Sequence, residues 1–219
     1  MKRFTIILLL FVAAGVFAQQ AVIREITGTV EVKQKGSAAW ETAARGQSVE
    51  MDTTISTGFK SYALIRIGNS VLNVRPLTRL TITEISTRAE TETIRINLNA
   101  GKMQAEVRAP TGGKPEFWLQ TPPATASVRG TVFEMGIFEL WVIEGSVEYR
   151  GSSGAGVVVD AGGYSYVNPK TGRAAFPRDA LLAGLDPELP IGFDNFYSFD
   201  GAVANKNNAG FDGEFDFGN

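Results

Sequence analysis

Short apolar or alternating segments follow one another along most of this chain, and glycine, asparagine, proline or serine separates each from the next. Segments of this kind predict strands, because successive side chains of a strand point to opposite faces of its sheet. Many short strands with regular turn signals are typical of all-β folds. We therefore predict an all-β protein, in which a single β-roll, sandwich or solenoid-like body of many short strands precedes a short C-terminal helix and a disordered tail. The predicted strands lie near residues 22–33, 48–56, 61–67, 70–75, 79–85, 93–98, 102–108, 116–120, 125–128, 131–136, 138–143, 146–150, 156–160 and 163–167.

The alternation of apolar and polar residues is most regular in the segments 79–85 and 93–98. Strands with one apolar face belong to antiparallel sheets whose other face meets water. Ile85 is out of phase with the apolar residues before it, which predicts a strand end or bulge near Glu84. The Gly-Asn pair at 68–69 separates two predicted strands and predicts a tight hairpin.

The first 18 residues predict a signal peptide. Two basic residues at 2–3 precede the apolar stretch 4–18, and the small side chain of Ala18 suits a cleavage site before Gln19. A retained membrane anchor is the alternative, but a bilayer span needs about 20 apolar residues, and this stretch has 15. We therefore expect an exported protein, periplasmic or secreted, with no transmembrane segment after cleavage.

The composition excludes several classes of function. The chain contains no Cys and no His, so it has neither the two commonest metal-ligand types nor the usual general base. With 21 basic and 23 acidic residues, it lacks the basic excess typical of nucleic-acid-binding proteins. We accordingly predict no cofactor, no metal, no catalytic residue and no nucleic-acid partner, and we do not expect an enzyme.

Four glutamates punctuate the apolar run between residues 131 and 150, and two carboxylates at the right separation can hydrolyse glycosides. Because apolar residues flank each of them, the simpler interpretation is that they line the solvated faces of strands. They are Glu134, Glu139, Glu144 and Glu148.

The C-terminal region divides into two parts. The segment 177–189 begins with PRDALLAGL, which predicts a short helical cap with proline near its start and glycine near its end. Residues 190–219 lose all periodicity and predict a disordered acidic tail. In this tail the Phe-Asp dipeptide occurs four times, either as compositional drift or as anchors that dock onto a partner. The phenylalanines of these dipeptides are Phe193, Phe199, Phe211 and Phe215.

The segment 121–149, TPPATASVRGTVFEMGIFELWVIEGSVEY, carries the most distinctive local pattern. Gly130 lies where the chain must turn sharply, since glycine takes a positive φ without steric cost. Arg129 could read a ligand. The simpler interpretation is that Arg129 pairs with a carboxylate across the corner while Thr131 satisfies a backbone group of the turn. We expect this corner, with Phe133 beside it, to be structural.

This segment resembles the core signature of the FecR domain, in which a TP…A…VRGTxF stretch precedes a strand and then a V.EG.V.V strand. The segments ITGTVEVK at 26–33, ISTGFKSYALIRIGNSVLNVRPLTRLTI at 55–82 and LNAGKMQAEV at 98–107 follow the family's order of strands and glycines. The resemblance extends over about residues 26–168. We therefore assign residues 19–176 to a FecR-like all-β domain.

The resemblance implies a periplasmic module that relays or scaffolds protein–protein contacts. Such a module is best known where it transmits the signal of an outer-membrane transporter to an anti-sigma system. This chain departs from that arrangement, because it has no cytoplasmic sigma-binding segment and its hydrophobic segment has the features of a cleavable one. We therefore predict a non-enzymatic exported envelope protein that acts as a FecR-like recognition or signal-relay module, with an envelope protein as its partner.

The alternative is a structural or cell-wall-associated envelope protein that binds glycan. Aromatic side chains exposed on a concave sheet would favour glycan binding, whereas their complete burial would favour protein binding. The three side chains that distinguish these functions are Trp40, Trp118 and Trp141.

Overall fold

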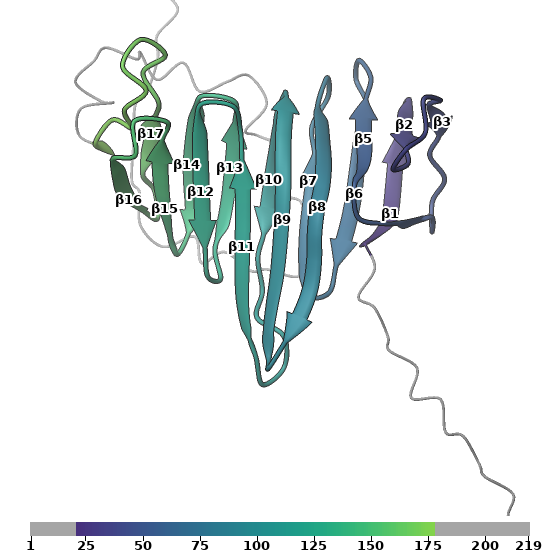
Figure 1. Ribbon diagram of the computed structural model, residues 1–219, viewed down its shortest axis with the longest axis horizontal. Coiled ribbons are helices and arrows are strands. Elements are labelled where there is room, and N and C mark those ends of the chain that lie inside the picture. The colour runs from purple at the N-terminus through teal and green to yellow at the C-terminus, as the bar shows by residue number, and fades with distance from the viewer. Residues whose placement is uncertain (1–20, 178–219) are drawn as a thin grey trace, which may run out of the picture. The chain divides into compact units, whose positions relative to one another are not determined.

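A computed structural model of the protein describes residues 21–177, which belong to one compact unit of the chain, and the strands in it form two sheets (Figure 1). The first sheet has the order β17 (Tyr164–Tyr166), β14 (Glu139–Glu144), β13 (Val132–Gly136), β10 (Lys102–Glu106), β7 (Ser70–Val74), β6 (Tyr62–Ile67), β1 (Ala21–Thr27) and β4 (Ser48–Val49). The second sheet has the order β16 (Gly156–Asp160), β15 (Ser146–Gly151), β12 (Ala124–Val128), β11 (Lys114–Gln120), β9 (Thr91–Ala100), β8 (Arg79–Arg88), β5 (Thr53–Thr57), β2 (Val30–Lys33) and β3 (Glu41–Thr42). The predicted all-β fold class is confirmed.

Strands enter both sheets in nearly the order of the sequence, so the chain passes back and forth between the sheets as it advances along the body (Figure 1). Neighbouring strands are antiparallel, as predicted, with one exception: β9 and β11 pair in parallel. The exception follows from the connection between them, because β10 lies between β9 and β11 in the sequence and belongs to the opposite sheet. The chain thus returns to the second sheet in the direction in which it left it.

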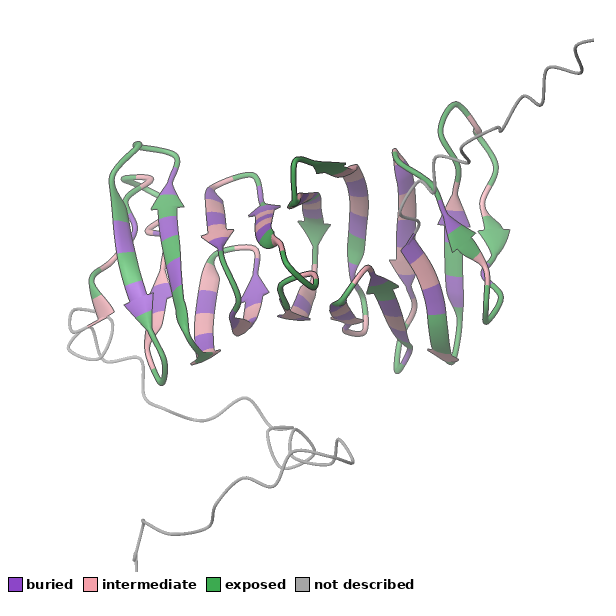
Figure 2. Cartoon of the chain, turned by 90° about the horizontal axis from the view of Figure 1, so that it is seen from below, coloured by how far each residue is buried: buried purple, intermediate pink, exposed green. Residues whose placement is uncertain are grey.

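The two sheets bury one continuous core between them, and buried and less buried residues alternate along most strands (Figure 2). Phe117 of β11 and Phe133 of β13 come from opposite sheets and meet edge to face, with ring centroids 6.0 Å apart. Burying a large apolar side chain of this kind stabilises the fold by about 1.5–3 kcal/mol. The largest fully buried side chains are Tyr149, Phe117, Phe133, Ile23, Ile55, Ile65, Ile67, Leu72, Leu80, Ile82, Ile94 and Ile96.

Several predicted local features are confirmed. Residues 68–69 form a two-residue hairpin loop between β6 and β7. The register between β8 and β9 shifts between Ile82 and Glu84, where the change of phase predicted a bulge. The hairpin between β8 and β9 has a loop of only two residues, because Arg88 pairs with Thr91. Those two residues, Ala89 and Glu90, both have positive φ, and the flanking strands extend further than their sequences indicated.

The tight hairpin at Gly68 lies against a buried carboxylate from the opposite sheet. Glu92 of β9 is only 1% exposed. A Cβ atom at Gly68 would collide with Oε1 of Glu92 and would lie 2.9 Å from its carboxyl carbon. Gly68 also has a φ of 54°, in the left-handed region. Two independent constraints, backbone conformation and space, therefore require glycine at this position.

Three predictions fall on residues that the structure does not describe: the signal peptide, the helical cap at 177–189, of which the structure describes Pro177 alone, and the acidic tail at 190–219. They stay predictions. Within residues 21–177, no helix is long and apolar enough to cross a membrane.

Candidate interaction surfaces

The predicted corner joins β12 to β13 and bonds to the start of β15. Gly130 has a φ of 88°, and a Cβ atom there would meet nothing within 4 Å, so its backbone conformation alone favours glycine. The Thr131 hydroxyl is buried and donates a hydrogen bond to the carbonyl of Ser146, at 3.0 Å. Phe133 lies in the core. These contacts all bind the corner to the fold.

Arg129 differs from the expectation. Its side chain is exposed, and no ion pair of Arg129 is found among residues 21–177. The corner therefore does not need a carboxylate partner to close. That the corner has no binding role stays a prediction.

The four glutamates that could have formed a hydrolytic pair are each joined to a basic side chain instead. The pair between Glu134 and Arg75 is the least exposed, with an Oε2 to Nη2 distance of 3.1 Å. The other three pairs are more exposed, and pairs of that kind contribute at most about 1 kcal/mol to stability. They join Glu139 to Lys102, Glu144 to Arg108 and Glu148 to Arg150.

Two tyrosines near the β17 end of the body have raised pKa values. Burial raises the pKa of Tyr149, whose hydroxyl donates to the carbonyl of Phe138 at 3.0 Å. Burial, with a smaller contribution from Glu139, raises the pKa of Tyr164 to about 12. Shifts in this direction keep both hydroxyls protonated at neutral pH, so neither is prepared to act as a base.

No group of three or more carboxylates suited to a metal ion occurs within the described part of the chain.

The three tryptophan side chains are neither fully buried nor fully exposed. Each is half-buried, so neither of the two outcomes that would separate glycan from protein binding is met. Arginine or lysine covers two of the rings, which leaves less aromatic surface for a sugar to stack on. The contacts are Lys33 and Arg79 over Trp40, at 5.2 and 5.5 Å, Arg95 over Trp118, at 4.9 Å, and Tyr164 edge-on to Trp141, at 6.1 Å.

Large apolar side chains are exposed on two neighbouring turns, which we call the apolar corner. Phe59, between β5 and β6, is 74% exposed, and Leu77, between β7 and β8, is 61% exposed. The Leu77 amide donates to the carbonyl of Gly58 at 3.2 Å, which joins the two turns. Tyr62, at the start of β6, is 40% exposed.

The backbone of the apolar corner is unusual. Lys60 and Leu77 have φ values of 51° and 56°, in the left-handed region that side chains other than glycine and asparagine rarely adopt. The ammonium of Lys60 lies 5.6 Å from the Phe59 ring. Strained residues that also expose apolar surface are candidates for a functional site.

The apolar corner was not predicted from the sequence. A signal for it exists, because phenylalanine and leucine occupy turn segments, TGFKS and RPLTR, that otherwise hold turn-forming or polar residues. Apolar residues in turns can also fold inward, however, so only the observed exposure distinguishes the two cases.

The family model described as FecR protein matches residues 53–148, from the start of β5 into β15, and this match includes the corner at Gly130. This part of the chain is therefore similar to the FecR family, as the sequence resemblance indicated.

Two solved structures are similar to this chain. Both are crystal structures of a "putative anti-sigma factor" from Parabacteroides distasonis ATCC 8503, at 1.65 and 2.50 Å resolution. Their sequences are 16% and 17% identical to this one, and each has a TM-score of 0.46. Each match covers 56% of this chain and 57% of the solved one, so the chain spans little more than half of their length. No curated protein matches the chain.

Proposed function

We propose that this protein is a non-enzymatic, exported envelope protein whose FecR-family domain recognises another protein in the periplasm and relays or scaffolds its signal. The family match supports a regulatory module of this kind. The predicted signal peptide supports export. The acidic Phe-Asp tail, through Phe193, Phe199, Phe211 and Phe215, is proposed as an additional docking segment.

The observation that carries the proposal is the apolar corner. Phe59 and Leu77 expose 74% and 61% of their surface. Apolar and aromatic side chains that are desolvated on association supply much of the energy of protein–protein contacts. A protein partner that covers both side chains would remove this exposed apolar surface from water.

Site-specific photocrosslinking tests the proposal. The full chain is expressed in its own host with p-benzoylphenylalanine at position 59 or 77, and crosslinked products are identified by mass spectrometry. Val158, on the outer face of β16, is the matched control, because it is 61% exposed, as is Leu77. We expect one defined envelope protein from positions 59 and 77 and none of it from position 158.

Two other outcomes have distinct meanings. Products that are the same from all three positions, or absent from 59 and 77, would refute docking at the apolar corner. Cell-wall glycan captured regardless of position would favour the alternative function, a structural or glycan-associated envelope protein. Repeating the capture without residues 190–219 tests the tail, and N-terminal sequencing of the periplasmic fraction tests cleavage before Gln19.

A further inference from the structure

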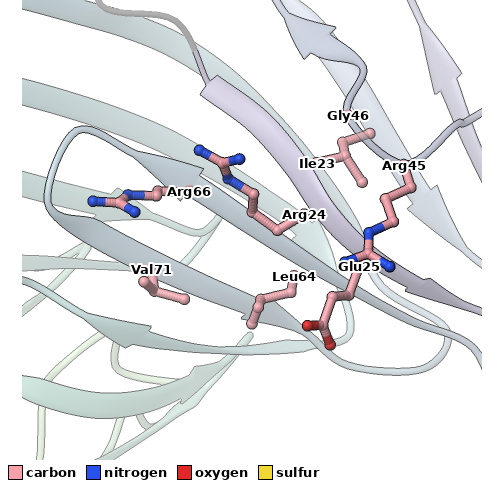
Figure 3. A pocket seen from close by; sticks show the side chains of 8 residues that line it. All are labelled: Ile23, Arg24, Glu25, Arg45, Gly46, Leu64, Arg66 and Val71. Atoms are coloured by element: carbon pink, nitrogen blue, oxygen red, sulfur yellow. The ribbon is translucent and has the colours of Figure 1, made fainter.

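An open depression of about 450 Å³ lies on the outer face of the first sheet, near its β1 end (Figure 3). Arg24 and Arg66 reach it from the neighbouring strands β1 and β6, and Arg45 reaches it from the loop between β3 and β4. Leu64 and Val71, both half-buried, add apolar surface between the charges. We call these five residues the arginine groove.

Local backbone features place the three arginines along the depression. The register between β1 and β6 shifts between Ile23 and Glu25, so Arg24 lies at a bulge, a feature that redirects side chains. The loop carrying Arg45 is bonded to the edge of β1, because the Gly46 amide donates to the carbonyl of Ile23 at 2.7 Å. The arginine groove is thus built by tertiary contacts.

The position of Arg66 is fixed by its own hydrogen bond. Its Nε donates to the carbonyl of Gly68, at 3.0 Å, in the hairpin that follows β6. A guanidinium has five N–H donors, so this bond leaves donors free for a ligand.

The arginine groove carries uncompensated positive charge. Among residues 21–177, none of its three arginines forms an ion pair. Glu25 is the single acidic residue that lines the depression. Elsewhere in the described part, four arginines each pair with a glutamate: Arg75, Arg95, Arg108 and Arg150.

Deepening the proposed function, on which this inference rests, we propose that the arginine groove binds an acidic peptide segment of a partner protein in which carboxylates alternate with large apolar side chains. Guanidinium groups bind carboxylates through paired hydrogen bonds, which favours arginine for this recognition. Leu64 and Val71 offer apolar contacts between the charges. The depression is open rather than enclosed, as an extended peptide requires.

Fluorescence anisotropy with a labelled peptide tests the proposal. The probe is FDGEFDF, which copies residues 211–217 and carries three carboxylates for three arginines. The receptor is the full mature chain with Asp212→Asn, Glu214→Gln and Asp216→Asn, so that its own copy of the sequence does not compete. Two further peptides separate the contributions: FNGQFNF lacks the carboxylates, and ADGEADA lacks the aromatic rings.

A matched pair of receptor variants distinguishes the groove from bulk charge. The groove variant replaces its three arginines with glutamine. The control replaces three exposed arginines that form no ion pair among residues 21–177, so the net charge of the two variants is equal. The substitutions are Arg24→Gln, Arg45→Gln and Arg66→Gln in the groove variant, and Arg88→Gln, Arg129→Gln and Arg173→Gln in the control.

We expect the groove variant to weaken probe binding at least about tenfold and the control to change it less than about twofold, since each lost charge-assisted hydrogen bond weakens binding severalfold. The FNGQFNF peptide should bind at least about tenfold more weakly than the probe. Equal losses in both receptor variants, or no measurable binding of the probe, would overturn the proposal. Equal binding of ADGEADA would also overturn it, by reducing the groove to a general anion site. The crosslinking positions of the proposed function lie outside the groove, so either experiment can fail without the other.

Discussion

The substitution Gly68→Ala tests how the two sheets fit together at the β6–β7 hairpin. Gly68 has a φ of 54°, and the carboxyl group of Glu92, 1% exposed, occupies the space where a Cβ atom would lie. An alanine at this position must therefore strain the backbone and also displace a buried carboxylate or open the turn. We expect a large loss of stability from a single added methyl group.

The magnitude follows from two terms. Holding an L-residue in the left-handed region costs about 1–2 kcal/mol, and inserting a methyl group into filled space costs about 1–3 kcal/mol more. Gly112→Ala is the matched control, because Gly112 has a φ of 75° and a Cβ atom there would meet nothing within 4 Å. The free energy of unfolding should thus fall by about 2–5 kcal/mol for Gly68→Ala and by about 1–2 kcal/mol for the control.

Urea denaturation followed by tryptophan fluorescence measures both values, since the chain has three tryptophans. A double-mutant cycle with Glu92→Ala isolates the collision, because removing the carboxylate should reduce the cost of Gly68→Ala toward that of Gly112→Ala. Equal losses for Gly68→Ala and Gly112→Ala in the unaltered background would refute the reasoning, and so would a cycle without coupling.

Two further predictions concern Thr131, in the turn between β12 and β13, and the two tyrosines with raised pKa values. Thr131→Val should lower the free energy of unfolding by about 1–2 kcal/mol, because it leaves the Ser146 carbonyl without its hydroxyl donor. Thr131→Ser keeps a hydroxyl group and should retain most of the stability. Equal urea midpoints for Thr131→Val and the wild type would contradict a stabilising role of this hydrogen bond. For Tyr149 and Tyr164 the folded-state pKa is raised above the unfolded value of about 10. The unfolded state therefore loses these protons first, so stability is fully present below about pH 10 and falls as the pH rises toward the folded pKa, about 12 for Tyr164. Urea midpoints measured at increasing pH should show this decline in stability, and Tyr164→Phe should make the decline shallower. The same decline in Tyr164→Phe and in the wild type would show that Tyr164 does not contribute to it.

Much of the fold could be predicted because its causes are local. Alternating residues decide which side of a strand is apolar, and this pattern located nearly all of the strands in residues 21–177. A change of phase before Ile85 was enough to predict the bulge in β8. Glycine at 130 was expected from the turn it occupies, and its φ of 88° explains that requirement.

The candidate surfaces could not be predicted in the same way. The exposure of Phe59 and Leu77 depends on how two turns meet, which a turn's own sequence does not encode. The arginine groove combines residues from two strands and a loop, and a bulge redirects one of them. No single segment of the sequence contains all the residues of the groove, so local sequence patterns could not predict it.

What the sequence determined by itself was the kind of structure: an all-β body, its strand positions, and the FecR signature around the corner at Gly130, because side-chain periodicity and turn chemistry act between near neighbours. Only the tertiary structure decided that β9 and β11 pair in parallel, since this depends on β10 crossing to the opposite sheet. The same holds for Glu92, which lies in a segment that looks like a polar loop and is buried because Gly68, 24 positions earlier, leaves room for its carboxylate. Contacts between sheets join residues that are distant in the chain, and the local sequence around one residue does not predict which distant residue it contacts.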